Sequence, residues 1–278
     1  PRASMSFIHQ KKIKQKLKRF TAFILLIYVM INASLYLLQD KILFRPTVLE
    51  QGHQFQFTHK FEEVFLTTEE HAVINAIHFK VENPKGVILY FHGNQGNLQR
   101  WGSITEYFVN KQFDVFVMDY RTYGKSTGAL NDPALYKDAE FMYNYVKKLY
   151  PESNIVVYGR SLGTTFATYV ASKHNPKMLI LETPYYSMVD VAKNRFPLIP
   201  VRQFMNYHFP TYKFINDVKC NISILHGTSD KVVPFSSGEK LYLTSPKTRT
   251  SFISIEGAKH NNLIDFEAYH REIDAVLR

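Results

Sequence analysis

The stretch NIVVYGRSLG at residues 154–163 joins an apolar run to a G-x-S-x-G pentapeptide centred on Ser161. A β-branched apolar run predicts a buried strand, and glycines flank a serine in this way where a strand turns sharply into a helix. Residues 164–171 begin with Thr-Thr and end in small and apolar side chains, as a helix there would. A bare G-x-S-x-G is a weak signal because glycine and serine are common in turns. The strand–turn–helix context makes Ser161 a candidate nucleophile that the rest of the chain must support.

Further apolar runs predict a sheet on both sides of this strand. The continuous runs are residues 87–91, 115–118, 155–157 and 178–181, and shorter or interrupted runs are residues 222–225 and 252–255. Strands that are apolar on both faces are typical of a parallel sheet covered by helices. Residues 61–67 and 73–79 alternate loosely and are joined by acidic, turn-forming residues, which predicts an antiparallel edge pair.

Helix-length segments separate most of these runs. The clearest begins at Asp132, an expected N-cap followed by Pro133 at the first helical position, and ends before Pro151. Its expected buried face consists of Leu135, Ala139, Met142, Val146 and Leu149. Alternation of strand and helix predicts a doubly wound α/β fold with a mostly parallel sheet and helices on both faces.

Residues 183–219 form a longer interval between two predicted strands and are rich in aromatic residues and proline. One interpretation is a helical excursion that packs its aromatic side chains into the domain. The other is a small cap over the active site, lined for an apolar or acyl group. The two interpretations are compatible, and the sequence leaves both open.

The net charge of +10 is concentrated at the N-terminus. Seven of the 34 basic residues lie between Arg2 and Arg19, where no acidic residue occurs, so the rest of the chain is nearly balanced. No basic stripe with interleaved aromatic residues remains, which argues against nucleic acid as a partner. We expect the basic segment, residues 1–19, to lie against anionic lipid head groups on the cytoplasmic side.

Residues 20–38 contain no charged side chain. As a helix they would extend roughly 28 Å, close to the hydrocarbon thickness of a bilayer, so we predict a single transmembrane anchor. The positive-inside rule then places the bulk of the chain on the far side. A cleaved signal peptide fits less well because Ile31-Asn32-Ala33 is a poor small-x-small site. Residues 39–60 are the expected connector, and residues 61–278 the catalytic domain with its cap at 183–219.

A serine on such a turn needs a histidine base and a carboxylate to orient that base, in the chain order serine, acid, histidine. Asp230 follows the predicted strand 222–225 within HGTSD, and His260 follows the last predicted strand within GAKH. Both would lie at the carboxyl edge of the sheet, where open parallel sheets bind ligands. The alternative acids Asp190, Asp217 and Asp265 do not follow a strand as closely.

The oxyanion formed during acyl transfer needs two backbone N–H groups. Leu162 follows the nucleophile and supplies one, and Asn94, in the turn after the strand 87–91, is the expected second donor. We expect His92 and His226 to pack or hydrogen-bond within their turns instead of acting as bases. Cys220 is the only cysteine, so no internal disulfide or cysteine zinc cluster can form.

Five motifs carry a resemblance to a known family: FHGN at 91–94, MDYRTYGKS at 118–126, GRSLG at 159–163, HGTSD at 226–230 and GAKHN at 257–261. Together they resemble the Bem46-like branch of the α/β-hydrolases, which is similar to membrane-associated serine hydrolases and protein depalmitoylases. The resemblance covers residues 61–277 and the anchor, and implies that Ser161, Asp230 and His260 form the triad. Two departures are Thr164, where relatives often have glycine, and Gln95, where alanine is usual.

The sequence therefore predicts a membrane-anchored serine hydrolase of esters or thioesters that acts on a small-molecule or acylated substrate without a metal or organic cofactor. A peptidase or amidase using the same triad is the nearest alternative, and an anchored binding protein without turnover is an alternative from another class. A bacterial inner membrane with the catalytic domain in the periplasm is the expected setting, although a eukaryotic membrane also fits. The oligomeric state stays open.

Overall fold

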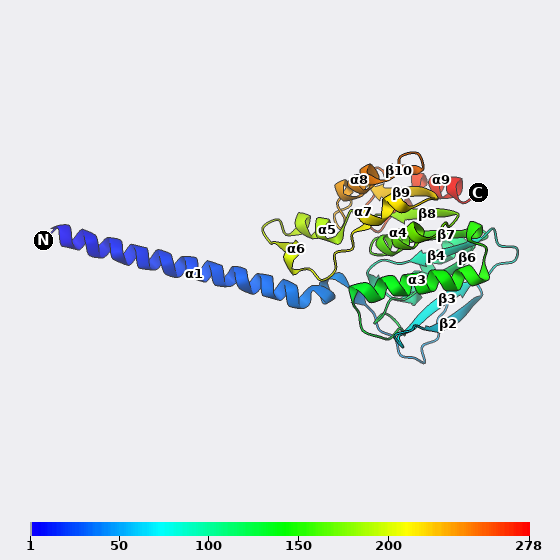
Figure 1. The fold of residues 1–278 in the computed structure, drawn as a ribbon, viewed down its shortest axis with the longest axis horizontal. Helices are drawn as coiled ribbons and strands as arrows, with labels where there is room; N and C mark the ends of the chain where they lie inside the picture. Colours follow the sequence, from blue (N-terminus) through cyan, green and yellow to red (C-terminus); the bar gives the residue numbers. More distant parts are fainter. Residues whose placement is uncertain (1) are drawn as a thin grey trace.

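An eight-stranded sheet in the order β10-β9-β8-β7-β4-β6-β3-β2 forms the centre of the catalytic body in the computed structural model (Figure 1). The structure describes the backbone of residues 2–278 and the side chains of residues 9 and 11–278. The strands are β2 Phe61–Thr67, β3 Val73–Phe79, β4 Val87–Phe91, β6 Asp114–Met118, β7 Ile155–Arg160, β8 Met178–Glu182, β9 Asn221–Gly227 and β10 Thr250–Ile255. Within this sheet, β3 runs antiparallel to both β2 and β6, and the other pairs are parallel. The predicted antiparallel edge pair and mostly parallel sheet are confirmed.

Helices cover both faces of the sheet, as predicted. They are α2 Leu98–Val109, α3 Asp132–Leu149, α4 Gly163–Lys173, α8 Phe235–Thr244 and α9 Glu267–Val276. Side chains of α3, α4 and α8 belong to one buried apolar cluster, and those of α2 and α9 belong to a second. In β4, Leu89 contributes to the first cluster and its neighbours Ile88 and Tyr90 to the second. The central strands are apolar throughout because successive side chains point to opposite, equally covered faces.

The register of the parallel strands brings the site residues together. Phe91 pairs with Gly159, and Arg160 pairs with Glu182, so β4, β7 and β8 end side by side. The loops that follow these strands therefore meet at one edge of the sheet. The predicted nucleophile lies in the loop that follows β7.

Helix α3 corrects two details of the sequence analysis. Its N-cap is Asn131, whose side-chain oxygen accepts a hydrogen bond from Ala134 N at 2.9 Å, and not Asp132, which is already the first helical residue. Asn131 caps because its backbone is extended, as an N-cap requires. Leu149, expected on the buried face, is 49% exposed because the helix ends there. The other four residues of the expected face are buried.

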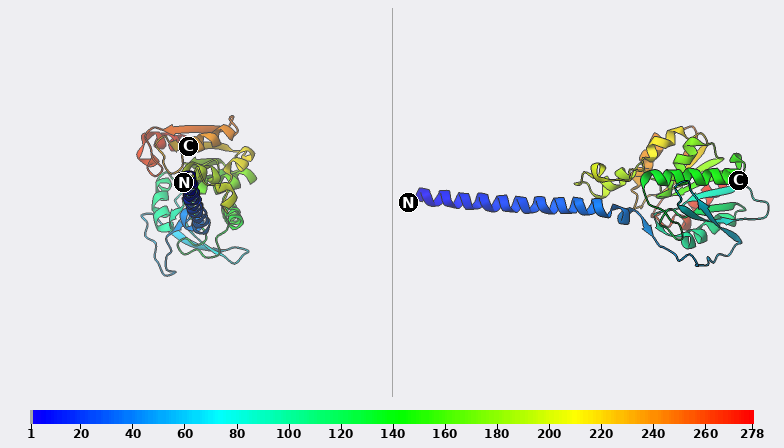
Figure 2. Two further views of the ribbon diagram at one scale, coloured as in Figure 1. Left: turned by 90° about the vertical axis from the view of Figure 1, so that its left-hand side faces the viewer. Right: turned by 60° about the horizontal axis from the view of Figure 1, so that its bottom comes forward.

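A single long helix, α1 Arg2–Leu43, projects from the body and contains the predicted span 20–38 (Figures 1 and 2). Among the described residues, it is the one helix long and apolar enough to cross a membrane, and its apolar side chains are mostly exposed. The helix continues past residue 38 to Leu43. Phe44 then enters the core, and the short strand β1 Arg45–Pro46 pairs with β5 Gln95–Gly96.

The segment 183–219 contains α5 Met188–Arg195, α6 Val201–Phe204, α7 Thr211–Phe214 and a 3₁₀ turn Ile215–Asp217. Helices α5 and α6 project from the body toward the last turns of α1 in both ribbon views (Figures 1 and 2). Tyr185 and Phe209 are fully buried in the core, whereas Phe196 and Phe204 line the cavity described below. The segment therefore both packs aromatic side chains into the core and lines the cavity, and we refer to residues 183–219 as the cap.

Candidate active site

Ser161 occupies a sharp turn between β7 and α4 with φ of 51°, a left-handed conformation that non-glycine residues rarely adopt. Its N–H donates to Glu182 O at 2.9 Å, which ties the turn to the neighbouring strand β8. Both flanking positions require glycine because a Cβ atom there would collide with neighbouring atoms. A Cβ at Gly163 would lie 2.0 Å from Phe91 O, and one at Gly159 would lie 2.7 Å from Ala167 Cβ. The motif thus positions the serine hydroxyl at the carboxyl edge of the sheet.

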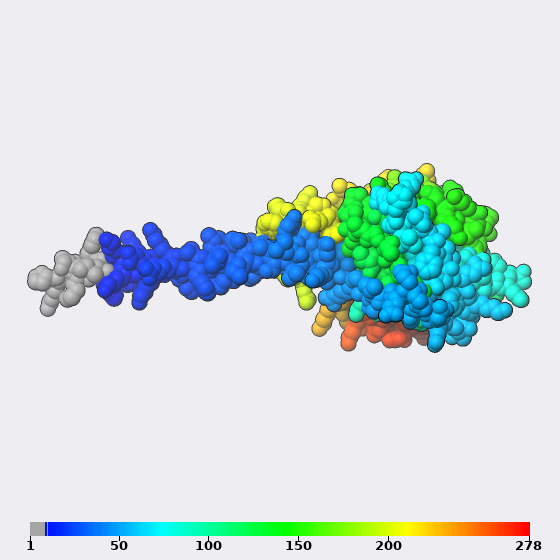
Figure 3. Space-filling model, turned by 90° about the horizontal axis from the view of Figure 1, so that it is seen from below, coloured from blue at the N-terminus to red at the C-terminus, as the bar shows by residue number. Residues whose placement is uncertain are grey.

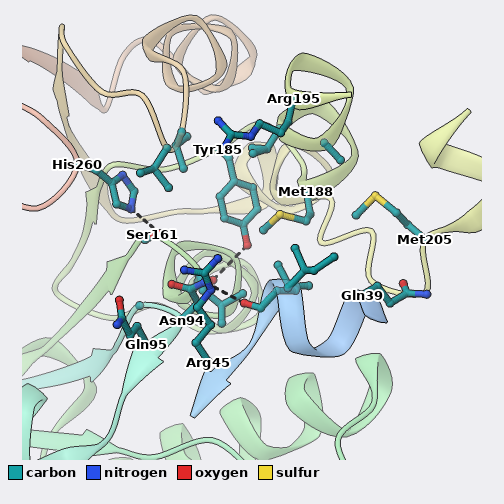
Figure 4. A pocket seen from close by; sticks show the side chains of 18 of the residues that line it. Gln39, Arg45, Asn94, Gln95, Ser161, Tyr185, Met188, Arg195, Met205 and His260 are labelled. Carbon is teal, nitrogen blue, oxygen red and sulfur yellow. Dashed lines mark hydrogen bonds between the residues drawn. The ribbon is translucent and has the colours of Figure 1, made fainter. Parts of the chain in front are cut away.

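The structure brings Ser161, His260 and Asp230 together. The Ser161 hydroxyl lies 2.9 Å from His260 Nε2 (Figure 4). His260 Nδ1 in turn lies 2.7 Å from Asp230 Oδ2. These side chains come from the loops after β7, β9 and β10. A carboxylate can only accept, so His260 donates from Nδ1, and its Nε2 is left to accept the serine proton. This is the arrangement in which imidazole serves as a base toward a hydroxyl.

Asp230 is held as a carboxylate. Its Oδ1 accepts hydrogen bonds from Val232 N at 2.8 Å and Val233 N at 2.9 Å. Burial acts to raise the pKa of Asp230, but the rings of His226 and His260 and these backbone donors outweigh burial and hold the pKa well below its ordinary value. His226 is fully buried, and its Nε2 lies 3.1 Å from Val233 O. It therefore supports the Asp230 loop, in agreement with its expected structural role.

The two expected oxyanion donors, Asn94 and Leu162, line the same cavity as the nucleophile. Among the described residues, neither Asn94 N–H nor Leu162 N–H donates to another protein group. Asn94 O accepts hydrogen bonds from Arg45 N at 2.9 Å and from the Tyr123 hydroxyl at 2.7 Å. The Asn94 side-chain amide donates to Leu43 O, the last carbonyl of α1, at 2.9 Å. The oxyanion loop is therefore fixed to the end of the N-terminal helix.

Thr164 supports the elbow from behind. It is fully buried, and its hydroxyl donates to Ser161 O at 2.6 Å, while its N–H donates to the same carbonyl at 3.0 Å. The threonine that departs from the family pattern thus adds a side-chain hydrogen bond to the nucleophile's own carbonyl. Gln95, the other departure, is exposed at the cavity wall, and its carbonyl accepts from Trp101 Nε1 at 2.8 Å.

The alternative acids do not reach His260. Asp190 accepts hydrogen bonds from Ser237 Oγ at 2.6 Å and Lys240 Nζ at 2.9 Å. Asp217 and Asp265 lie in 3₁₀ turns outside the site. His92 is fully buried, with Nδ1 2.6 Å from Gly93 O and its ring stacked on Trp101. Its position agrees with the expected packing role.

A buried ion pair next to the nucleophile was not predicted from the sequence. Arg160 Nε lies 3.2 Å from Glu182 Oε1, and the Tyr158 hydroxyl donates to Glu182 Oε2 at 2.6 Å. The Arg160 guanidinium also lies 5.5 Å from the centre of the Trp101 ring. The available signal was a charged residue at the end of each of two apolar runs, Arg160 and Glu182, which adjacent parallel strands would bring together.

A cavity of about 540 Å³ opens at the nucleophile and lies within the usual size range of ligand sites. It extends from Ser161 and His260 at one end to Gln39 and Met205 at the other (Figure 4). Its walls come from the catalytic loops, the cap and the last turns of α1. Among the described residues that line it, no side chain is acidic, and the charged ones are Arg45, Arg100, Arg160, Arg195 and Lys231. No group of three or more His, Cys, Asp or Glu in the described part of the chain is arranged to hold a metal ion.

Comparison with known proteins gives matches over most of the chain. A family model described as "Serine aminopeptidase, S33" (Hydrolase_4) matches residues 82–223, about half of the chain. This range includes Ser161 but not Asp230 or His260. An uncharacterised protein of Acanthamoeba polyphaga mimivirus is 32% identical over 262 residues, which cover 82% of this chain and 88% of the viral protein.

Two further matches connect the chain to proteins with named activities. The lysophosphatidylserine lipase ABHD12 of Danio rerio is 30% identical over 177 residues, but the chain spans only 46% of that protein. An esterase of Pyrococcus furiosus, Pf2001, has a similar fold with a TM-score of 0.67 at 17% identity, covering 84% of this chain and all of the esterase.

Proposed function

The chain belongs to the α/β-hydrolase superfamily, within the family of serine hydrolases described as serine aminopeptidase S33, and from that membership we propose a membrane-anchored hydrolase of carboxylic esters or thioesters. The observation that carries the proposal is the hydrogen-bonded series from the Ser161 hydroxyl through His260 to Asp230, with distances of 2.9 and 2.7 Å. Asp230, His260 and Ser161 take the roles of orienting acid, base and nucleophile. The names of the fish lipase and the archaeal esterase agree with ester hydrolysis.

The proposed reaction passes through an acyl-enzyme. Ser161 Oγ attacks the carbonyl carbon while its proton moves to His260 Nε2, and the N–H groups of Asn94 and Leu162 receive the oxyanion. His260 then returns the proton to the leaving oxygen or sulfur as the tetrahedral intermediate collapses. A water molecule, deprotonated by His260, attacks the acyl carbon and regenerates Ser161. These reaction steps need no metal or organic cofactor.

The proposed setting is a membrane. Helix α1 would cross the bilayer once, with the basic segment on the cytoplasmic side and the catalytic body on the far side. The bacterial inner membrane remains our proposed location. The basic residues of the cavity wall favour a small-molecule or acylated substrate that carries negative charge, and they give no reason to propose nucleic acid as a partner.

A peptidase or amidase is the second candidate, because the matching family model is described as a serine aminopeptidase. The same triad cleaves both bond types. The esterase and peptidase hypotheses are separated by initial rates. We compare a p-nitrophenyl ester and a peptide p-nitroanilide, each with a long-chain ester as the reference. Faster turnover of the anilide than of any ester would favour the second candidate.

The first test is labelling of native membranes with a fluorophosphonate probe. We expect the wild-type chain to be labelled and Ser161→Ala to lose both the label and ester hydrolysis, the latter by a factor on the order of 10⁴ or more. Ser103→Ala is the matched control, because Ser103 lies on an exposed part of α2 and should leave both unchanged.

The same labelling experiment, done with a membrane-impermeant probe, shows on which side of the membrane the catalytic body lies. Label from the side opposite the N-terminus supports the proposed orientation, whereas label only from the cytoplasmic side overturns it. A folded chain that no probe labels would favour the non-catalytic binding protein.

A further inference from the structure

One face of α1 belongs to the wall of the active-site cavity. Asn32 is 92% buried, and Leu35, Gln39 and Leu43 are half-buried, whereas most other described residues of this helix are exposed. The spacing of three and four residues places these four side chains on one face. All four line the cavity that begins at Ser161. The last turns of the anchor are therefore part of the site and not merely a tether.

The cap is fastened to the same part of α1. Gln39 Oε1 accepts from Asn206 N at 2.7 Å, and Gln39 Nε2 lies 3.4 Å from Phe204 O. Farther along the helix, the Tyr28 hydroxyl lies 3.4 Å from Leu198 O. Figure 3 shows the cap in yellow beside the last turns of α1. The contact with Tyr28 fixes how far the cap reaches along the anchor.

That reach places the end of the cap within the bilayer. Tyr28 precedes Leu38, the last residue of the uncharged stretch, by ten residues, or about 15 Å along a helix. The hydrocarbon core of a bilayer is roughly 30 Å thick. If α1 crosses the membrane through its uncharged stretch, Leu198 lies well inside the leaflet nearest the catalytic body.

The chemistry of this end of the cap fits hydrocarbon. Residues 196–201 read FPLIPV and contain no polar side chain. Pro197 and Pro200 have no N–H to satisfy, and the N–H groups of Phe196, Ile199 and Val201 donate to backbone carbonyls. Leu198 is 86% exposed, the largest exposed fraction among the described large apolar side chains. We call residues 196–201 the cap tip.

We propose that the cap tip is immersed in the leaflet beside α1 and that the acyl chain of a bilayer lipid ester passes between α1 and the cap to reach Ser161. The cavity already connects these parts, because Asn32 and Leu35 of α1, Phe196 and Ile199 of the cap tip, and Ser161 all line it. Asn32 Oδ1 is buried and has no hydrogen-bond partner among the described residues, and Asn32 lies in this wall, where the oxygen would accept a hydrogen bond from a substrate hydroxyl. The substrate would not have to leave the membrane. The acyl-chain part rests on the proposed hydrolase function, whereas immersion of the tip does not.

Immersion is tested in the full chain, reconstituted in phosphatidylcholine vesicles. Cys220 is buried, so Leu198→Cys in a Cys220→Ala background gives one accessible thiol for an environment-sensitive fluorophore. Leu149→Cys is the matched control, an exposed leucine at the end of α3 that leads to the start of β7, away from Ser161. We expect spin-labelled acyl chains to quench the fluorophore at 198 and aqueous iodide to quench that at 149. Iodide quenching at 198 equal to that at 149 would overturn the proposal.

Substrate entry is tested with Leu198→Asp. We measure the ratio of two rates, hydrolysis of a long-chain lysophospholipid in vesicles and hydrolysis of a short soluble ester. The ratio should fall by about tenfold or more, because a charged side chain is costly in hydrocarbon. Leu149→Asp should keep the wild-type ratio. An unchanged ratio for Leu198→Asp, or cleavage of a vesicle-bound acylated peptide but of no lipid ester, would refute entry of a lipid ester from the leaflet.

Fluorophosphonate labelling of each sample separates the two hypotheses. Labelled Ser161 together with an iodide-accessible residue 198 would refute the immersion alone. Unlabelled Ser161 in a chain whose fluorophore reports immersion would refute the hydrolase function and leave the membrane contact standing. Retained labelling of Leu198→Asp also shows that this variant folds.

Discussion

At the scale of single residues, the site depends on a serine held in an unfavourable backbone conformation. Ser161 has φ of 51°, where an L side chain costs about 1–2 kcal/mol. The surrounding structure keeps it there through its own N–H, which donates to Glu182 O, and through its carbonyl, which accepts from Thr164. The backbone strain at Ser161 lowers the stability of the elbow. The same conformation directs the Ser161 hydroxyl toward His260.

This strain predicts a difference between two inactive variants. Ser161→Gly should have a free energy of unfolding about 1 kcal/mol higher than Ser161→Ala, because only glycine adopts this conformation without penalty. The measurement is urea unfolding in detergent micelles. At Ser103, inside α2, the same pair should differ in the opposite direction by about 1 kcal/mol. Equal stability of the two Ser161 variants would mean that the turn stores no strain.

The three hydrogen-bonded residues proposed as the triad could be predicted from sequence because each follows an apolar run that must be a strand. Parallel strands place such positions at one edge, whatever the distance between them along the chain. The Arg160–Glu182 pair was missed because neither residue belongs to a catalytic pattern, and the pair depends on the register of β7 against β8. The Asn94 side-chain bond to Leu43 was missed for the same physical reason, since it joins distant segments.

At the scale of elements, β3 and the end of α3 are joined by a buried polar chain. His78 Nε2 lies 2.8 Å from the Tyr150 hydroxyl, which donates to Asp114 Oδ2 at 2.6 Å. Burial, together with the charge of Lys80, lowers the pKa of His78 to about 4, against the opposing charges of Asp114 and Glu62. The folded protein therefore favours the neutral form of the His78 ring.

The lowered pKa predicts a loss of stability in mild acid. Well above pH 6.5, the ordinary pKa of histidine, the His78 ring is neutral in both the folded and the unfolded protein, and its contribution to the free energy of unfolding is fully present. As the pH falls from 6.5 toward about 4, His78 becomes protonated in the unfolded chain but stays neutral in the folded protein. The free energy of unfolding therefore decreases, by at most about 3 kcal/mol.

His78→Gln, which can still hydrogen-bond to Tyr150, is the variant that isolates this effect. It should be less stable than wild type at neutral pH but should show a flatter pH dependence between 6.5 and 4. Urea unfolding at several pH values provides the comparison. Parallel curves for the two proteins would assign the acid loss to other groups.

The elements themselves were predicted more reliably than their ends. Periodicity gave α3 and its buried face, but it could not show that Leu149 is exposed, because exposure at a helix end depends on how far the neighbouring elements extend. The cap shows the same limit. Its aromatic composition fitted both core packing and a cavity wall, and residues of the two kinds, Phe209 and Phe204, lie only five positions apart.

At the scale of the whole molecule, helix α1 and the catalytic body form one unit. Leu43 at the end of α1 accepts the amide of Asn94, the residue whose N–H is proposed to bind the oxyanion. Gln39, one turn earlier, holds the cap. Composition predicted a helix that spans a membrane, but it gave no sign of this second role, because polar contacts with distant segments leave no periodic pattern.

This coupling predicts the effect of cutting one contact. Asn94→Ala keeps the backbone N–H but removes the bond to Leu43, so the loop loses its fixed position. We expect kcat for a short soluble ester to fall about tenfold, which is less than the effect of losing an oxyanion donor outright. KM should change little. Asn144→Ala, which truncates an exposed side chain of α3, is the control. Retention of wild-type kcat by Asn94→Ala would show that the loop is positioned without the anchor.

The bond between Asn94 and Leu43 also bears on where the enzyme can work. A protease that cut between α1 and the body would release a fragment whose oxyanion loop, cap and cavity had each lost a supporting contact. Shedding would therefore weaken the activity of the released fragment instead of only dispersing it. If α1 spans a membrane as proposed, hydrolysis would stay at the surface to which the helix is attached, and damage to the chain would release only an impaired enzyme.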